Sequence, residues 1–146
     1  MIKTYSLSKD GDKQLAKNFK LKEFRCKDGS DKVLVDELLP TALQIYRDTI
    51  NMPINILSAY RTESYNESCG GAKNSYHVLG CANDIYCKGK KALDIAKWFE
   101  ANGEKLGIRG IGLYINRAIE FVHIDTRKTK YYWINENGIN RKVDSF

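Results

Sequence analysis

The two histidines of this chain constrain its fold most strongly, because each lies in a segment whose composition is typical of a metal ligand. His77 belongs to the segment 75–84, which reads Ser-Tyr-His-Val-Leu-Gly-Cys-Ala-Asn-Asp. His123 belongs to the segment 120–125, which reads Glu-Phe-Val-His-Ile-Asp. Imidazole and carboxylate are common zinc ligands, and catalytic zinc usually has three protein ligands and one open position. The residues therefore predict one zinc ion held by His77, Asp84 and His123.

The surroundings of both histidines favour a metal site over two unrelated surface or hydrogen-bonded histidines. Gly80 permits a backbone conformation that residues with a Cβ resist, and Ala82 is small enough to let chain segments approach. The apolar stretch 118–125 predicts a strand that holds His123 in a fixed place. The sequence therefore favours zinc-assisted hydrolysis, with Glu120 close enough in sequence to serve as the general base.

Three blocks of sequence occur in the order 58–61 (Ser-Ala-Tyr-Arg), 70–84 and 121–125 (Phe-Val-His-Ile-Asp). In this order they resemble the zinc D-Ala-D-Ala peptidase family. That family includes D-Ala-D-Ala carboxypeptidases, the vancomycin-resistance D-Ala-D-Ala dipeptidases and phage L-alanyl-D-glutamate endolysins. The stretch 21–29 is similar to the opening of the family's single-domain subgroup, so the resemblance covers about residues 19 to 133.

The resemblance implies roles for two further residues. It places the general base three residues before the second histidine, at Glu120. It also implies that Arg61 binds either the oxyanion that develops during the reaction or a carboxylate of the substrate. Residues three apart on a regular strand face opposite sides, whereas His123 shares its face with Asp125. Asp125 therefore remains the competing candidate, either as the base or as a partner of His123.

Several side chains near these motifs are candidates for contact with the substrate. Ser75 is expected to bond the substrate backbone or the metal loop, and Tyr76 and Trp133 are expected to line the cleft. Asp125 is included among the substrate-binding residues. The family often has glycine at the position of Ala59 and a smaller polar residue at that of Tyr76, which leaves the ligand set intact.

These residues predict a zinc-dependent peptidase that hydrolyses peptidoglycan stem peptides next to a D-amino acid. A terminal D-Ala-D-Ala bond, an internal L-Ala-D-Glu bond and a cross-link all remain open as its target. The alternative is a non-catalytic zinc-binding domain of the same fold, used as a cell-wall binding module, because the hedgehog signalling domain shares this fold. A base at Glu120 favours the enzyme. A nucleic-acid binder would rest on charge alone.

Composition limits the partners and the location of the protein. The chain has 146 residues with a net charge of +6, which predicts one domain with some attraction to an anionic polymer such as the cell wall. No nucleic-acid motif and no apolar run of membrane-spanning length are present, so neither partner is expected. The N-terminus lacks the apolar core of a signal peptide. We therefore expect a monomer made in the cytoplasm, with reduced cysteines, that reaches the wall through phage-type lysis.

The pattern of apolar residues and turns predicts an α+β fold, in which helices pack around a small antiparallel sheet as in the hedgehog and D-Ala-D-Ala peptidase domains. Residues 1–18 are expected to form an irregular arm of the single domain 1–146. Helical spacing over 33–50 predicts a helix that Ser30 or Asp31 caps and that Pro40 kinks or divides. The other expected helices are 63–68 and 90–106, and the expected strands are 54–58, 82–86, 110–114 and 118–125.

Overall fold

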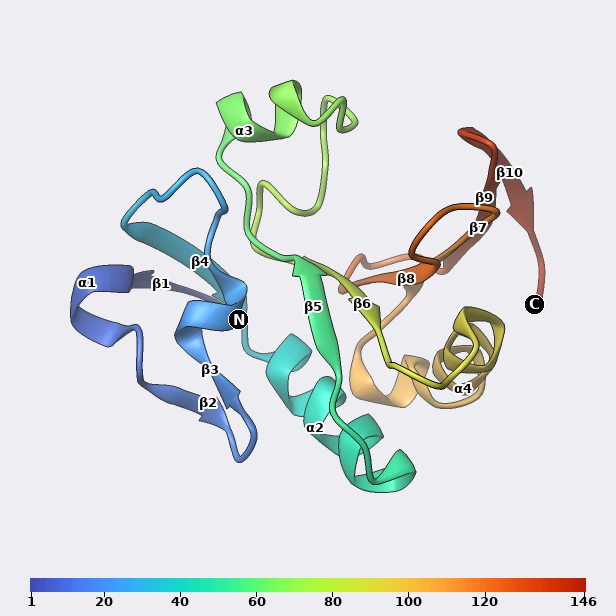
Figure 1. Cartoon of the computed structure of the whole chain (residues 1–146), viewed down its shortest axis with the longest axis horizontal. Coiled ribbons are helices and arrows are strands. Elements are labelled where there is room, and N and C mark those ends of the chain that lie inside the picture. The colour runs from blue at the N-terminus through green and yellow to red at the C-terminus, as the bar shows by residue number, and fades with distance from the viewer.

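A six-stranded sheet forms the centre of the molecule in the computed structural model, which describes all 146 residues (Figure 1). Its strands lie in the order β10-β9-β7-β8-β6-β5. Their bounds are β5 Asn55–Ser58, β6 Ala82–Tyr86, β7 Gly110–Ile115, β8 Phe121–Asp125, β9 Tyr131–Glu136 and β10 Ile139–Val143. All neighbours are antiparallel except β7 and β9, which are parallel. The sheet is therefore mixed, and not antiparallel throughout as the sequence predicted. The exception is β9, which pairs in parallel with the edge of β7 opposite to β8.

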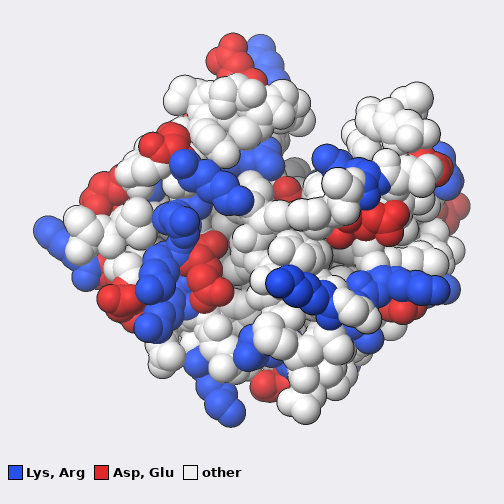
Figure 2. Space-filling view, viewed as in Figure 1, with Lys and Arg blue, Asp and Glu red and all other residues white.

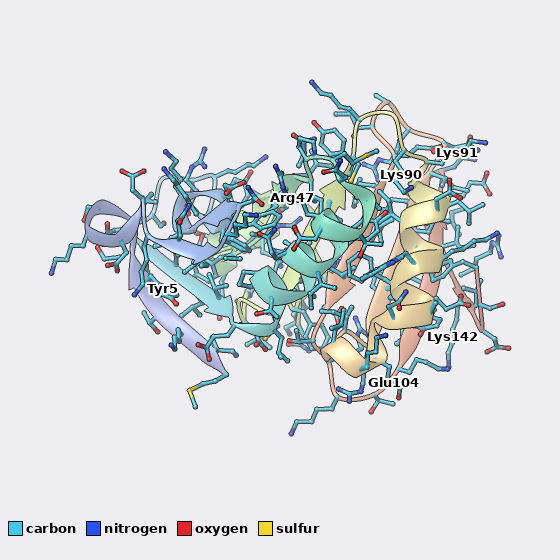
Figure 3. The ribbon with its side chains drawn as sticks, turned by 90° about the horizontal axis from the view of Figure 1, so that it is seen from below. Tyr5, Arg47, Lys90, Lys91, Glu104 and Lys142 are labelled. Carbon is cyan, nitrogen blue, oxygen red and sulfur yellow. The ribbon has the colours of Figure 1, made fainter.

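Two helices cover one face of this sheet (Figure 3). They are α2 (Leu38–Ile50) and α4 (Ala92–Asn102), which contact each other through the rings of Tyr46, Trp98 and Phe99. Val122 and Ile124 of β8 are fully buried in the core. Because side chains alternate along a strand, Phe121, His123 and Asp125 point to the opposite face. The core thus anchors β8 and presents His123 on the face that the helices leave uncovered.

The first eighteen residues are ordered, so the predicted irregular arm is wrong. β1 (Ile2–Ser6) pairs antiparallel with β4 (Lys32–Asp36), and β2 (Gln14–Ala16) pairs with β3 (Phe19–Lys20). The short helix α1 (Leu7–Asp10) lies between β1 and β2, and the 3-10 helix η1 (Leu21–Phe24) follows β3. None of the residues 1–18 is buried, which is why their pattern lacks the apolar alternation of a core strand.

The helix expected over 33–50 begins only at Leu38, and the strand β4 precedes it. Pro40 lies in the first turn of α2. Backbone N–H groups in the first turn have no hydrogen-bond partner within the helix, so the N–H that proline lacks is not needed there, and Pro40 does not kink the helix. The Asp36 carboxylate, not Ser30 or Asp31, accepts from a first-turn amide, that of Leu38, at 3.1 Å. Asp31 instead accepts a hydrogen bond from the backbone of Ser8 at 2.7 Å.

The elements that carry the predicted site follow the sequence pattern closely. The short helix α3 (Glu63–Ser68) begins after Thr62, whose hydroxyl accepts from the backbone of Tyr65 at 3.2 Å. The helix expected over 90–106 divides into α4 and the 3-10 turn η2 (Glu104–Leu106). The strand expected from residue 118 begins only at Phe121, which leaves Glu120 outside it. No helix is both long and apolar enough to cross a membrane.

Candidate metal centre

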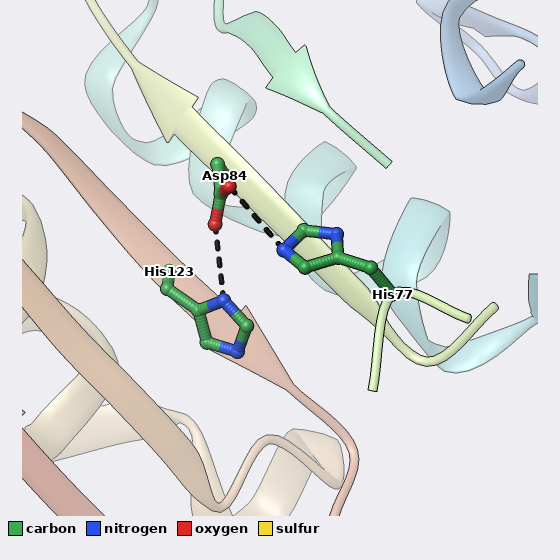
Figure 4. Close-up of side chains that lie close together, drawn as sticks. All are labelled: His77, Asp84 and His123. Carbon is green, nitrogen blue, oxygen red and sulfur yellow. Dashed lines mark hydrogen bonds and ion pairs between the residues drawn. The ribbon is translucent and has the colours of Figure 1, made fainter. Parts of the chain in front are cut away.

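Two neighbouring strands and one loop bring His77, Asp84 and His123 together (Figure 4). Asp84 of β6 lies directly opposite His123 of β8 in the antiparallel register. His77 comes from the loop before β6, where Gly80 has a φ of 76° and where an added Cβ would lie 2.5 Å from the Leu34 carbonyl oxygen. The potential ligand atoms of the three residues lie within 4.8 Å of one another. The predicted ligand set is therefore assembled at one point.

Each imidazole turns one nitrogen toward Asp84 and engages the other with a separate oxygen. His77 Nε2 is 3.3 Å from Asp84 Oδ2, and its Nδ1 lies 2.7 Å from the carbonyl oxygen of Ala59. His123 Nδ1 is 3.0 Å from Asp84 Oδ1, and its Nε2 lies 2.8 Å from Asp125 Oδ2. Histidines that bind metals usually donate their other ring N–H to a carbonyl or carboxylate oxygen. This arrangement fits a metal ion bound by the two inward nitrogens and Asp84.

The charges of the cluster favour a cation between its members. Asp84 is only 6% exposed, and burial opposes its ionisation, but His77 and His123 hold the pKa of this carboxyl far below its usual range. Burial also opposes a charge on His123, but the hydrogen bonds and charges of Asp125 and Asp84 raise the pKa of the imidazole to about 9. In the absence of metal, a proton on His123 therefore supplies the positive charge that these carboxylates require.

Asp125, predicted among the substrate-binding residues, contacts His123 and is not among the residues that line the cleft. Its side chain is fully buried. Arg127 donates to it from the backbone N at 3.1 Å, from Nε at 2.8 Å and from an Nη atom at 2.6 Å. Burial opposes the ionisation of Asp125, but the hydrogen bonds of Arg127 and His123 lower its pKa to about 2. Asp125 thus remains ionised, accepts hydrogen bonds from Arg127 and His123, and orients the imidazole of His123.

An open cleft of about 570 Å³ leads to this cluster. One wall is the loop after α3, which contributes Ser75 and Tyr76, and the other is formed by β9 and β10, which contribute Trp133. Figure 2 shows the hollow between these two parts of the molecule. The ring of Trp133 lies 5.1 Å from that of His123, between their centroids, and an added Cβ on Gly112 would meet the indole at 2.4 Å. A substrate in the cleft would therefore reach His123 past Trp133.

Comparison with known proteins agrees with this geometry. A family model described as Peptidase M15 matches residues 17–125, which contain all three members of the cluster. The chain belongs to the peptidase M15 family. This is the zinc D-Ala-D-Ala peptidase family that the sequence motifs resemble, so the predicted resemblance is confirmed. Its members are zinc peptidases, which makes zinc the metal to consider for the cluster.

The chain is also similar to a protein of Haemophilus influenzae described as probable peptidoglycan L,D-endopeptidase MepK. The two are 33% identical over 81 residues, which cover 52% of this chain and 40% of the relative. The match therefore spans less than half the length of the relative.

The predicted catalytic residue Arg61 lies in the cleft of this M15 peptidase, beside the metal cluster. Its guanidinium donates to Ser58 Oγ at 2.9 Å and to Asn66 Oδ1 at 3.1 Å, and it pairs with Asp84 Oδ2 at 3.4 Å. Because these contacts fix the guanidinium near Asp84, Arg61 is placed to meet a negative charge close to the cluster. Ser75, by contrast, uses its hydroxyl to accept from the His77 backbone at 3.2 Å, which supports the metal loop.

The other predicted catalytic residue, Glu120, does not join the cluster in this structure. Its side chain is exposed and does not line the cleft. Its carboxylate accepts a hydrogen bond from the backbone of Asn116 at 3.1 Å, within the connection between β7 and β8. Sequence reasoning also missed Arg117 and Arg127, both of which line the cleft. The only sequence signal for Arg127 was its position two residues after Asp125, because residues two apart on an extended chain point to the same side.

Proposed function

We propose that this M15 peptidase is a zinc-dependent enzyme that hydrolyses peptide bonds of peptidoglycan stem peptides next to a D-amino acid. The observation that carries this proposal is the buried set of His77, Asp84 and His123 at the end of an open cleft. Its donor types suit zinc, and both imidazoles are oriented from behind as zinc ligands usually are. The name of the Haemophilus influenzae relative supports peptidoglycan as the substrate.

In this proposal, His77, Asp84 and His123 hold one zinc ion, which supplies Lewis-acid chemistry for peptide hydrolysis. Asp125 accepts the Nε2 proton of His123 and so keeps Nδ1 directed at the metal. Arg61 binds the negative charge that develops on the carbonyl oxygen, or a carboxylate of the substrate close to the cluster. Ser75, Tyr76 and Trp133 contact the peptide in the cleft.

We assign the proton acceptor to Glu120. Asp125 is a weak candidate, because its oxygens already accept from Arg127 and lie beside His123 inside the protein. Glu120 directly precedes Phe121, which lines the cleft, and its single hydrogen bond to Asn116 is exposed. To act as the base, the Glu120 carboxylate has to leave Asn116 and turn into the cleft when substrate binds. Catalytic contacts are often long or absent before substrate is bound.

The finer details of the proposal concern the bond, the fold and the route to the substrate. The name of the relative favours an L,D-endopeptidase over a terminal D-Ala-D-Ala carboxypeptidase. The fold is proposed to be that of the D-Ala-D-Ala peptidase and hedgehog domains, formed by one monomeric domain. The wall is proposed to be reached through phage-type lysis.

A second candidate function is a non-catalytic zinc domain that binds the cell wall. The observation in its favour is the position of Glu120, which is engaged outside the cleft. Such a domain would keep the zinc site and bind peptidoglycan without changing it.

Digestion of purified peptidoglycan, followed by mass spectrometry of the released fragments, distinguishes the two functions. Zinc-loaded wild-type protein should release fragments that end at one stem-peptide bond, and the His123→Ala variant should release none. Arg47→Gln, on the helical face of the sheet, is the control for an unrelated loss of charge. If the wild type binds zinc and wall but leaves every stem peptide intact, the enzymatic proposal fails and the binding module is the better account.

A further inference from the structure

The cleft has an excess of positive charge that its own carboxylate does not balance. Arg61, Arg117 and Arg127 line it, and Asp84 is the only carboxylate among the lining residues. Arg61 pairs with Asp84 at 3.4 Å, and Arg127 pairs with the buried Asp125 at 2.6 Å. Arg117 forms no ion pair and no side-chain hydrogen bond with the protein. One guanidinium of the cleft is thus available for an anionic ligand.

Aromatic rings hold this free guanidinium at the wall of the cleft. The central carbon of the Arg117 guanidinium lies 4.9 Å from the ring centroid of Phe121 and 5.7 Å from that of Tyr114. The two rings stack on each other with centroids 4.5 Å apart and an angle of 11° between their planes. Attraction between a cation and aromatic faces restricts the side chain while its N–H donors remain free. Arg117 is therefore positioned before a ligand arrives.

The backbone at Arg117 is braced by its neighbour Asn116. Asn116 has a left-handed φ of 57°, and its backbone N donates to Glu120 at 3.1 Å. Its side-chain amide donates to Glu136 at 2.6 Å. The carboxylates of Glu120 and Glu136 thus accept hydrogen bonds from Asn116, and neither forms an ion pair with Arg117 in this structure.

We propose that Arg117 binds a carboxylate of the peptide substrate and selects peptides that carry it. This inference rests on the proposed function. A planar guanidinium with free donors suits two parallel hydrogen bonds to a carboxylate. Phe121 lies two residues from His123 on the same strand face, about 7 Å away, and Arg117 lies beyond Phe121. The carboxylate therefore belongs to a residue roughly two or three positions from the bond that is cut, because an extended residue spans about 3.5 Å.

A stem peptide offers this carboxylate from two sources, the α-carboxylate of a D-glutamate within the chain and the free C-terminus. Three synthetic stem peptides separate them: one with both carboxylates, one with D-glutamate amidated, and one with the C-terminus amidated. Binding is measured by calorimetry, and cleavage by chromatography, for wild type, Arg117→Gln, Arg117→Lys and the control Arg47→Gln. Arg47 lies on α2, which covers the other face of the sheet (Figure 3).

Arg117→Gln should weaken binding of the peptide with both carboxylates by about 3- to 10-fold, since the contact is partly exposed to solvent. Amidating one of the two carboxylates should weaken wild-type binding by a similar factor and should add nothing in the Arg117→Gln variant. Arg117→Lys should recover part of the loss, and Arg47→Gln should match wild type.

The inference is overturned if Arg117→Gln binds all three peptides as wild type does, or loses the same factor with every peptide. The proposed function fails in a different way, when the wild type binds these peptides but cleaves none. Binding that discriminates between carboxylate and amide through Arg117 would support the inference even then. Absence of any binding to the wild type would overturn it.

Discussion

His123 carries a proton between two buried carboxylates in the metal-free protein, and this proton should make the free energy of unfolding depend on pH. Asp125 and Asp84 raise the pKa of His123 to about 9 against the opposing effect of burial, from an ordinary value of 6.5. Below pH 6.5 both the folded and the unfolded chain bind this proton, and the stabilisation is fully present. As the pH rises toward 9, only the folded chain still binds the proton, and the stabilisation is progressively lost.

The magnitude follows from the two pKa values. The interval between 6.5 and about 9, at about 1.4 kcal/mol per pH unit, corresponds to a loss of roughly 3 kcal/mol over this range. Zinc competes with the proton for His123, so the zinc affinity should change in the opposite direction. It should rise up to about tenfold per pH unit across the same interval.

Urea denaturation of zinc-stripped protein between pH 6 and 8.5, with a chelator present, measures the first effect. Burial raises the pKa of Cys87 to about 11, whereas an unfolded thiol has a pKa of about 8.5, so the cysteines add a smaller loss of stability at the upper end of this range. His123→Gln is the matched variant, and it should retain only this smaller loss. A flat wild-type profile, or an equal slope in His123→Gln, would refute the reasoning.

Four substitutions test the assigned roles of single residues. Glu120→Gln should retain zinc and lower the rate of hydrolysis about 10²–10⁴-fold, whereas Asp125→Asn should lower this rate only about 10–100-fold, because Asp125 acts through His123. Both variants are measured by steady-state kinetics with zinc analysis, and the reverse order of the two losses would contradict the assignment. Arg61→Ala should retain zinc and lower kcat by about tenfold or more, and a rise in KM alone would show that Arg61 binds substrate and transition state equally. Gly112→Ala should displace Trp133, since the added Cβ would lie 2.4 Å from the indole, and should destabilise the protein by about 1–3 kcal/mol in urea; an unchanged midpoint and unchanged tryptophan fluorescence would contradict this packing.

The sequence predicted the members of the cluster because each lies in a short local motif, although the pairing of β6 with β8 that joins Asp84 to His123 spans 39 residues. Asp84 and His123 each lie on a short apolar strand, and the two strands are direct neighbours in the sheet. The spacing of His77, Gly80 and Asp84 similarly describes a turn that leads into a strand. The elements expected at 63–68 and 82–86 appear with those bounds.

Features that depend on distant pairing were not predictable in the same way. β1 pairs with β4 across about thirty residues, and neither the exposed β1 nor the spacing of Val33 and Val35 distinguishes a strand from a helix. The parallel pairing of β7 with β9 arises because the chain after β8 pairs with the other edge of β7, and no local sequence pattern indicates that choice. The position of Glu120 depends on a turn in which Asn116 adopts a left-handed conformation, and periodicity contains no information about that turn.

The central claim is that one zinc ion at His77, Asp84 and His123 enables the cleavage of peptidoglycan peptides. Its most direct test is a titration of zinc-stripped protein with zinc, in which the rate of stem-peptide release and the bound zinc are measured in the same samples. We predict no release without zinc, a linear rise with bound zinc and a plateau at one ion per chain. Release that persists in the stripped protein, or one bound zinc per chain with no release, would contradict the claim.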